Sequence, residues 1–465
     1  YVPFHLVEIF VRSAYAEFVA LAIVPFLFWA FTELVVAPSL RRVGLAAFTY
    51  GLLVLTHHTT FFTFSPLLML YIFYLTLAKT RFNLKFFLAK AGYAASAGLL
   101  GVALAAIYLI PVIVETRYIK VEQWTSGSYN YLQHFVYFAQ FFSPDWGYGY
   151  AGVGLADDLS YQLGIVVIAL LSFALVFSLT QQFPQRGTAL FFLTATFGVI
   201  LLMSPLAEAI WRVIPIATLV QFPWRLLGMT AFTMSVVAGS LLAETNSQQS
   251  TANDQVSTDL QIPTSNQPST IYYLPSSTLY LLCLVVILAS FSYTLPQYTE
   301  IPVWAETPLA VINWDRASIV DRVGMVSATQ EQPQTSPLEQ QYLNGEPLSA
   351  AGLVAGQGTV ETLHRGGASS QVKVVAAEPV TLQFYTYDYP GWQVTLNNQP
   401  IPHRHEPPFG LITVDIPAGD HIVLLRMGST PPRTLGITVS GLALLTITCL
   451  YFWNNFPFRR PNTDY

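Results

Sequence analysis

The sequence is poor in charged residues and in cysteine. Of its 465 residues, 10% are charged and 53% are hydrophobic, whereas about 25% of a soluble domain is charged. This shortage of charge excludes a soluble globular enzyme, because a single soluble core could not bury so much apolar surface. Cys283 and Cys449 are the two cysteines. Both lie inside apolar runs, so we expect neither a disulfide framework nor a zinc cluster.

The sequence also has no long run of like charges and no recognisable start. Its formal net charge is -5, from 21 basic and 26 acidic residues, so nucleic acid is not expected as a partner. The first residue is Tyr1 instead of Met, and no basic region with a cleavage site precedes the first apolar run. We therefore expect the sequence to be a fragment that lacks its N-terminal helices.

Apolar segments long enough to cross a bilayer are abundant. A membrane-spanning helix needs about 20 apolar residues. Segments of this kind lie near 15–37, 43–57, 60–78, 87–110, 162–180, 188–204, 226–243, 276–294 and 434–453. The polar run from His57 to Thr60 favours two helices between 43 and 78 instead of one. The sequence thus predicts an α-helical polytopic membrane protein with about nine transmembrane helices.

The basic residues predict the orientation of these helices. They fall on alternate connections, at Arg41 and Arg42, at Lys79, Arg81 and Lys85, at Arg186, and at Arg459 and Arg460. Cytoplasmic loops are rich in Lys and Arg, so this side is expected to be cytoplasmic. It includes the polar stretch 245–270, which has the composition of a disordered linker. The outer loop 111–161 and the segment 295–433 then lie on the extracytoplasmic side.

The segment 295–433 differs in character from the rest of the chain. Its second half alternates between apolar and polar residues, and turn signals separate the runs 371–375, 380–387, 392–396, 411–416 and 421–426. This pattern predicts a β-sandwich at 370–428, with Trp392 in or beside its core. The expected organisation is therefore a helical domain at 1–294, an extracytoplasmic domain at 295–433, and a last helix and cytoplasmic tail at 434–465.

Several short motifs resemble one group of bacterial polytopic membrane proteins. They are Arg12–Glu17, Tyr131–His134, Phe142–Gly149, Leu159–Gly164 and Gln221–Arg225. The group is labelled "6-pyruvoyl-tetrahydropterin synthase-related", although this sequence has neither a soluble fold nor the histidine zinc site that a pterin synthase needs. Near the C-terminus, Tyr389–Trp392, Ile416–Gly419 and Thr430–Arg433 look like the end of the related YfhO-like proteins.

Both groups resemble the GT-C superfamily of membrane glycosyltransferases. The resemblance implies a polyprenyl-phosphate sugar donor, used on the outer face of the bacterial cytoplasmic membrane. It also implies an envelope glycan as the acceptor. Proteins of this type carry their catalytic acid in the first outer loop, so we expect that residue to lie upstream of Tyr1. A non-catalytic transport or assembly protein for envelope polymers is the alternative, and it would place charges along a path through the helices.

Three arginines are candidates for binding the donor phosphate. Arg225 follows Phe222-Pro223-Trp224 at the outer mouth of a helix, where a guanidinium is able to bind a phosphate with two hydrogen bonds. Arg212 and Arg12 are expected at the same face. The alternative is that these residues are interfacial arginines that extend toward lipid headgroups. The expected site is a cleft lined by Arg225 and at least two of the other candidates.

Further candidates come from the helix ends and from the loop 111–161. His57 or His58 is placed to bind sugar or phosphate, or to act as an acid or base. The alternative is a histidine whose hydrogen bonds are satisfied within the turn between two helices. Glu17, His134 and Asp145 are the catalytic candidates, and the last two are also candidates for a divalent cation. Aromatic rings and carboxylates suit sugar binding, and they are found here at Trp124, Trp146, Tyr148 and Asp157. An ordinary amphipathic loop, with Asp157 as a helix cap, has the same composition.

One histidine pair lies outside these segments. His403 and His405 are separated by one residue, a spacing that some metal sites use. Glu406-Pro407-Pro408 follows at once and indicates a loop. We expect no metal site there, and no cofactor is identified from the sequence.

Overall fold

The structure is a computed structural model. It describes residues 2–149, 151–155, 158–180, 183, 185–214, 217–242, 276–295, 300, 302–317 and 323–452. The chain divides into two compact units. The helical unit comprises Tyr1–Ala103, Asn130–Gln297 and Leu444–Tyr465, and the β unit comprises Leu104–Tyr129 and Tyr298–Ala443. The expected linker 245–270 lies outside the described residues.

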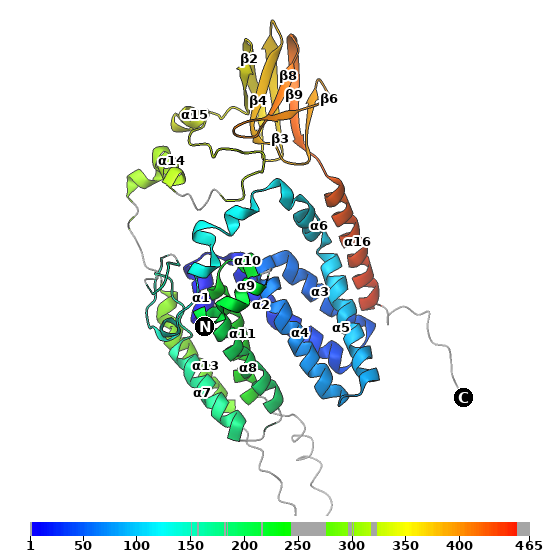
Figure 1. Ribbon diagram of the computed structural model, residues 1–465, viewed down its shortest axis with the longest axis vertical. Helices are drawn as coiled ribbons and strands as arrows, with labels where there is room; N and C mark the ends of the chain where they lie inside the picture. Colours follow the sequence, from blue (N-terminus) through cyan, green and yellow to red (C-terminus); the bar gives the residue numbers. More distant parts are fainter. Residues whose placement is uncertain are drawn as a thin grey trace, which may run out of the picture. The chain divides into compact units, whose positions relative to one another are not determined.

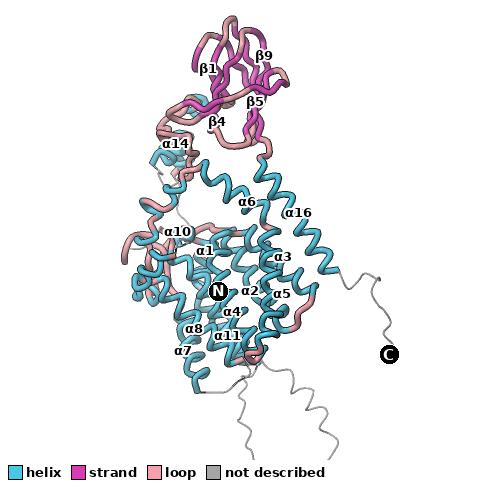
Figure 2. Tube along the Cα trace, turned by 45° about the vertical axis from the view of Figure 1, so that its right-hand side comes forward, coloured by secondary structure: helices cyan, strands magenta, loops and turns pink. Residues whose placement is uncertain are grey.

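The helical unit is built from helices that run roughly side by side (Figures 1 and 2). They are α1 (Pro3–Phe10), α2 (Tyr15–Val36), α3 (Leu40–Thr56), α4 (His58–Thr80), α5 (Leu84–Leu104), α7 (Ile165–Thr180), α8 (Arg186–Met203), α11 (Leu227–Leu242) and α13 (Ser276–Ser290). Short helices at the ends of these include α9 (Glu208–Val213), α10 (Ala217–Val220) and η7 (Pro223–Leu226). The helix α16 (Pro431–Phe452) spans the junction between the two units.

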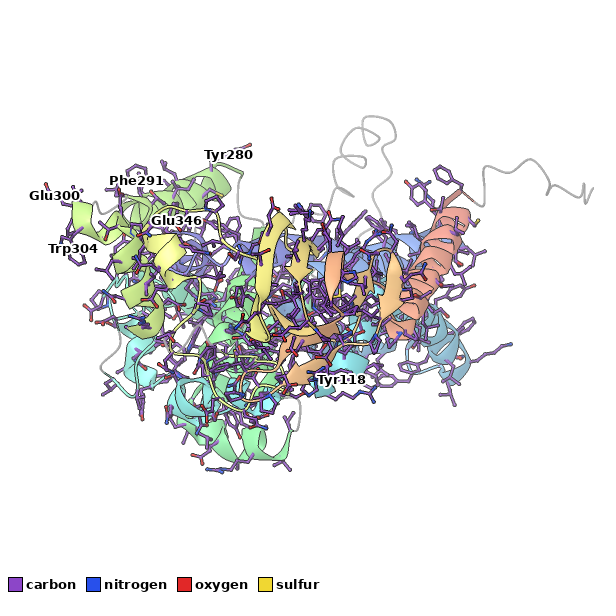
Figure 3. The ribbon with its side chains drawn as sticks, turned by 90° about the horizontal axis from the view of Figure 1, so that it is seen from above. Tyr118, Tyr280, Phe291, Glu300, Trp304 and Glu346 are labelled. Carbon is purple, nitrogen blue, oxygen red and sulfur yellow. The ribbon has the colours of Figure 1, made fainter. Side chains whose placement is uncertain are left out.

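In the part of the chain that the structure describes, five helices are long and apolar enough to cross a membrane. They are α2, α4, α5, α8 and α16. On α13 and just after it, the aromatic side chains of Tyr280 and Phe291 are 73% and 54% exposed and lie on the outside of the helices (Figure 3). Exposed apolar side chains of this size are costly in water and ordinary in lipid. The fold is therefore that of a membrane-associated helical protein with a β-sheet domain near its C-terminus.

Small residues and aromatic rings hold the helices together. A Cβ atom on Gly101 of α5 would lie 2.8 Å from the carbonyl oxygen of Ala47 in α3, so these two helices approach as closely as glycine permits. In the interior, the ring of Phe28 lies 4.6 Å from that of Phe232 and 6.1 Å from that of Phe192. These contacts join α2 to α8 and α11.

Two helix boundaries follow from local chemistry. His57 adopts extended backbone angles, and its imidazole nitrogen accepts a hydrogen bond from the backbone N–H of Thr60, so it caps α4. The prediction of two helices between 43 and 78 is therefore confirmed. The single helix expected at 87–110 is wrong, because the chain leaves the helical conformation at Ala105. It continues as α6 (Ala106–Glu115), which belongs to the β unit.

The β unit contains a two-layer antiparallel sandwich, shown in magenta in Figure 2. One sheet has the order β1-β4-β8-β7 and the other has the order β2-β3-β9-β5-β6. The strands are β1 (Ala351–Ala355), β2 (Gly358–Arg365), β3 (Ser369–Ala376), β4 (Val380–Tyr387), β5 (Trp392–Leu396), β6 (Gln399–Ile401), β7 (Arg404–Glu406), β8 (Leu411–Ile416) and β9 (Gly419–Met427). The sandwich thus begins well before residue 370, and its five expected strands correspond to β3, β4, β5, β8 and β9.

The sandwich core follows from the alternation along these strands. Val372, Leu382, Phe384, Val414 and Val423 are fully buried between the sheets. Trp392 is partly buried and packs beside this core. The segment before the sandwich forms η9 (Val303–Glu306), α14 (Pro308–Ala317) and α15 (Glu339–Leu343).

A buried ion pair joins α6 and α16. The guanidinium of Arg433, in the first turn of α16, donates to the carboxylate of Glu115 at the end of α6 over 2.8 Å. It also donates over 3.0 Å to the carbonyl oxygen of Pro390, in the turn that precedes β5. The hydroxyl of Thr430 donates to the second oxygen of Glu115. These bonds connect the last helix directly to the sandwich.

Candidate functional site

Two carboxylates of the helical unit share one arginine. The guanidinium of Arg12 donates to Glu17 over 3.0 Å and also contacts Glu8, and the side chains of both glutamates are almost fully buried. The chain between α1 and α2 makes this possible, because Ser13 adopts a φ of 52° and turns Arg12 back over both helices. The spacing of five residues between Arg12 and Glu17 does not suit a pair within one helix. The two residues pair because Arg12 follows α1 and Glu17 lies in α2.

Glu8 is the functional candidate that the sequence analysis missed. Its side chain has no exposed surface, and its Oε2 atom has no hydrogen-bond partner among the described residues. Burial and the nearby charge of Glu17 raise the pKa of Glu8 to about 8, although Arg12 and Arg225 oppose the rise. The only sequence signal was a Glu four residues before an Arg within an apolar stretch.

Aromatic rings cover this charge cluster. The guanidinium of Arg12 lies 4.5 Å from the ring centre of Trp224, and that indole stacks on the ring of Phe222 at 5.2 Å. Arg225 lies over the other ring of the stack, 5.0 Å from the centre of Phe222. Its Nη1 atom donates over 3.2 Å to the carbonyl oxygen of Val220 and to the side-chain oxygen of Gln221. Cation–π contacts thus bring both arginines to the Phe222-Trp224 pair.

The histidines at the α3–α4 junction lie within electrostatic reach of the same cluster. Burial lowers the pKa of His57 to about 4. The carboxylate of Glu17 opposes this shift, while the charges of His58, Arg225 and Arg12 add to it. His57 is therefore neutral near pH 7 and is occupied as the cap of α4. The exposed His58 also interacts with the charges of Arg225 and Glu17.

His134 joins this group through packing. It is 6% exposed, and its ring meets the edge of Phe222 at 4.7 Å. The structure therefore brings together six of the residues predicted from the sequence, although they come from segments far apart in the chain. They are Arg12, Glu17, His57, His58, His134 and Arg225. Glu8 belongs to the same cluster.

The remaining candidates of the helical unit have other surroundings. Asp145 is exposed and accepts a hydrogen bond of 2.8 Å from the hydroxyl of Ser143. The indole of Trp146 stacks on Tyr293 at 4.4 Å, and the hydroxyl of Tyr148 donates to the carbonyl oxygen of Leu295. These contacts attach the loop to the end of α13. They are typical of structural packing.

Two further candidates are placed elsewhere. Arg212 is 58% exposed and pairs with Glu208 one turn earlier in α9 over 2.6 Å, a surface ion pair. Trp124 belongs to the β unit, where its indole packs closely on Gly324. The loop 111–161 is thus divided between the two units. Asp157 lies outside the described residues.

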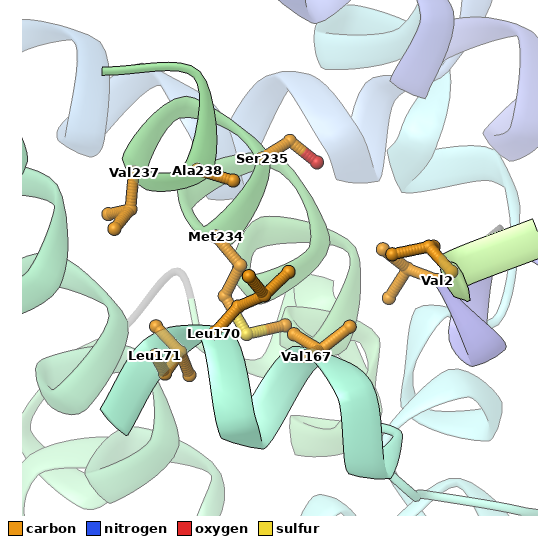
Figure 4. Close-up of a pocket in the computed structure, with 9 residues that line it drawn as sticks. Val2, Val167, Leu170, Leu171, Met234, Ser235, Val237 and Ala238 are labelled. Atoms are coloured by element: carbon orange, nitrogen blue, oxygen red, sulfur yellow. The ribbon is translucent and has the colours of Figure 1, made fainter. Parts of the chain in front are cut away.

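An apolar cavity of about 120 Å³ lies between α7 and α11 in the helical unit (Figure 4). Its lining includes Val2, at the entrance to the helix that carries Glu8, together with Leu170, Leu171 and Met234. The cavity would accommodate a short hydrocarbon segment and no sugar. Arg225 does not line it, so the cleft expected at Arg225 stays a prediction.

A second set of titratable side chains lies on the β unit. Asp388 is approached by the imidazoles of His403 at 3.4 Å and His405 at 3.0 Å. The hydrogen bond from His403 and the one from His405 lower the pKa of Asp388 against the opposing effect of burial. Among the residues that the structure describes, no group of three or more His, Cys, Asp or Glu side chains is arranged to hold a metal ion.

Comparison with known proteins gives no match. No family model, no curated protein and no solved structure matches this chain. Membership of the GT-C superfamily and glycosyltransferase activity therefore stay predictions.

Proposed function

We propose that the protein is a GT-C-like membrane glycosyltransferase that uses a polyprenyl-phosphate sugar donor. In this reaction the acceptor hydroxyl attacks the anomeric carbon of the donor. The bond from that carbon to the phosphate oxygen breaks, the polyprenyl phosphate leaves with the bonding electrons, and a carboxylate takes the acceptor proton. The site must therefore hold a lipid phosphate at the membrane surface and keep carboxylates beside it.

The observation that carries this proposal is the cluster of two arginines and two buried carboxylates under the Phe222-Trp224 pair. Arg12 is already bonded to Glu8 and Glu17. Arg225 donates to two neutral oxygens, of Val220 and Gln221, and a phosphate is a stronger acceptor than either. Arg225 is therefore the residue proposed to hold the departing phosphate.

The other members of the cluster have supporting roles in this proposal. Arg12 fixes the position of Glu17 and balances its charge. Glu8, with its raised pKa, holds a proton near pH 7 and so adds no second negative charge beside the donor phosphate. The base that removes the acceptor proton is the carboxylate that the family resemblance assigns to the first outer loop. The proposed location is the bacterial cytoplasmic membrane, with the sandwich on the extracytoplasmic side and an envelope glycan as acceptor.

One observation favours the alternative function of transport or polymer assembly. A fully buried carboxylate with a pKa near neutrality, beside two arginines, is also the kind of group that couples proton binding to a conformational change. Under this alternative Glu8 would exchange its proton with the solution during the working cycle. No sugar bond would be made or broken.

The deciding experiment uses the protein in lipid nanodiscs with purified envelope glycan as the acceptor. The donors are radiolabelled undecaprenyl-phosphate glucose and undecaprenyl-phosphate mannose. We expect release of undecaprenyl phosphate to fall at least 10-fold in Arg225→Lys, because an ammonium cannot reproduce the two-pronged contact of a guanidinium with phosphate. Arg41→Lys is the matched control, since Arg41 hydrogen-bonds Tyr451 outside the cluster.

Two outcomes would count against the glycosyltransferase. Undiminished release by Arg225→Lys would remove Arg225 from the site. Failure of the wild-type protein to release polyprenyl phosphate from either donor, together with proton uptake that Glu8→Gln abolishes, would favour the transport alternative.

A further inference from the structure

The sheet β1-β4-β8-β7 of the sandwich has a second face that does not contact the core. On β4, Leu382 and Phe384 point into the core, so Gln383, Tyr385 and Tyr387 lie on the opposite face. Gly352, on the neighbouring strand β1, leaves space for the hydroxyl of Tyr385, because a Cβ at that position would lie 2.5 Å from it. This face therefore presents two tyrosine rings and a side-chain amide.

A cavity of about 720 Å³ lies between this face and the segments that precede the sandwich. Trp314 of α14, Tyr342 of α15 and the stretch 332–338 form its other walls. Arg316 and Glu339, which also line it, pair with each other over 2.6 Å and connect α14 to α15. Their charges are thus largely satisfied within the wall. The remaining lining is mostly aromatic, aliphatic or amide, with the hydroxyls of Thr335 and Ser336 and the carboxylate of Asp315.

The wall of the cavity is anchored to the sandwich. The backbone N–H of Gln330 donates to the carbonyl oxygen of Pro408 over 2.6 Å, and the hydroxyl of Thr329 donates to the carbonyl oxygen of Phe409 over 3.0 Å. Phe409 and Leu411 form part of the cavity lining at the same point. The cavity is therefore formed by the folded β unit itself.

One polar group in the wall of the cavity lacks a hydrogen-bond partner among the described residues. The Nε2 atom of Gln332 is buried, and it has no hydrogen-bond partner in the part of the chain that the structure describes. A buried amide donor without an acceptor costs about 1–3 kcal/mol. A ligand oxygen would satisfy it once the Gln332 side chain, which lines the cavity, turns its amide inward.

We propose that this cavity is a binding site for a short neutral oligosaccharide. Pyranose rings present C–H faces that stack on aromatic side chains, and here Trp314, Tyr342, Tyr385 and Tyr387 supply the rings. Sugar hydroxyls accept from and donate to side-chain amides, and Gln332 and Gln383 supply these. The volume lies within the usual range for ligand pockets and fits about two or three sugar rings.

Other occupants fit the lining less well. A lipid chain would leave the amide of Gln332 without a partner. An anionic ligand would meet the lining residue Asp315 and would find Arg316 already paired with Glu339. The proposed site needs no residue of the charge cluster, and it does not depend on the proposed transfer reaction.

The test uses the full chain in nanodiscs and two probes, maltotriose and N,N′,N″-triacetylchitotriose. Saturation-transfer NMR reports which ligand protons contact the protein, and titration of the tryptophan fluorescence gives the affinity. We expect at least one probe to bind with a millimolar or lower dissociation constant, with the transferred signal on the C–H protons of the rings. Trp314→Ala should weaken binding at least 10-fold.

The matched control is Trp304→Ala. Trp304 is 69% exposed, lies in η9 a short distance before α14, and does not line the cavity (Figure 3). Its removal should leave binding unchanged. A second variant, Gln332→Leu, removes the unpartnered amide without shortening the side chain greatly, and should also weaken binding.

Three results would overturn the proposal. They are the absence of binding by both probes at 10 mM, equal weakening by Trp314→Ala and Trp304→Ala, and displacement of a bound sugar by phospholipid alone. Release of undecaprenyl phosphate is measured in a separate assay. Failure of this binding site and failure of the proposed glycosyltransferase are therefore distinguishable.

Discussion

Arg433 donates two hydrogen bonds to one carboxylate oxygen of Glu115, from Nε over 3.1 Å and from Nη2 over 2.8 Å. The side chain of Glu115 is 6% exposed and that of Arg433 is 24% exposed. A carboxylate this deeply buried depends on its partner for its charge to be tolerated. The pair therefore makes the junction between the last helix and the sandwich sensitive to either residue.

We expect Arg433→Met to destabilise the β unit by about 3 kcal/mol, because it leaves Glu115 charged, buried and without its cation. The double variant Arg433→Met with Glu115→Gln should recover much of this loss. Hydrogen exchange of peptides covering 428–436 measures the effect in the full chain. Equal protection in the wild type and in Arg433→Met would contradict the prediction.

The buried Glu8 predicts that the stability of the helical unit depends on pH. Its pKa in the folded protein is about 8, above the value of about 4.3 for an unfolded chain. The folded state then holds the proton more tightly than the unfolded state. Its contribution to stability is complete below pH 4 and is lost as the pH rises through 8.

Thermal unfolding followed by tryptophan fluorescence between pH 5 and pH 9 measures this loss of stability. Glu8→Gln carries no titrating group, so its curve should lack this fall. Glu33→Gln is the control, because Glu33 is partly exposed and pairs with Arg42. Parallel curves for the wild type and Glu8→Gln would show that Glu8 does not titrate in this range.

Trp392 and Trp304 allow the contribution of a partly buried ring to the stability of the β unit to be compared with that of an exposed ring. Trp392 is partly buried beside the core, so Trp392→Ala should cost about 2 kcal/mol, less than the 3–5 kcal/mol of a fully buried ring. Trp304 is 69% exposed, and Trp304→Ala should cost less than about 0.5 kcal/mol. Protease resistance of the β unit in the full chain ranks the two variants. A greater loss of protease resistance in Trp304→Ala than in Trp392→Ala would contradict the placement of Trp392 beside the core.

The distribution of Lys and Arg predicts that the sandwich lies outside the cell and that residue 250 lies inside. In a background with Cys283→Ala and Cys449→Ala, a single cysteine replaces either Ala368 or Ser250. Ala368 is exposed in the turn between β2 and β3. A membrane-impermeant thiol reagent applied to intact cells should label position 368 and leave position 250 unlabelled. The reverse pattern would invert the whole topology.

The positions of helices and strands are predictable from the sequence where one pattern dominates a segment. Apolar runs located the helices α2, α4 and α8, and the strands β3, β4 and β8 follow from strict alternation around a buried core. The strand β2 escaped notice because it is an edge strand whose side chains are mostly exposed. The strands β6 and β7 have three residues each, too few for alternation to be visible.

The candidate site was only partly predictable for a different reason. The residues Arg12, Glu17 and Arg225 were identified by chemical type and expected membrane depth. The bond between Arg12 and Glu17 depends on the backbone turn at Ser13, a residue type that gives no warning of a positive φ. Glu8 lies in a helix of eight residues, where a single carboxylate among apolar neighbours resembles a surface position.

The position of β9 determines the order in which the sandwich is able to form during synthesis. This strand is the last to leave the ribosome, yet it lies in the middle of its sheet, between β3 and β5. Until it emerges, β3 has no partner on one side and β5 has only the short β6. The earlier strands must therefore wait with their pairing edges open.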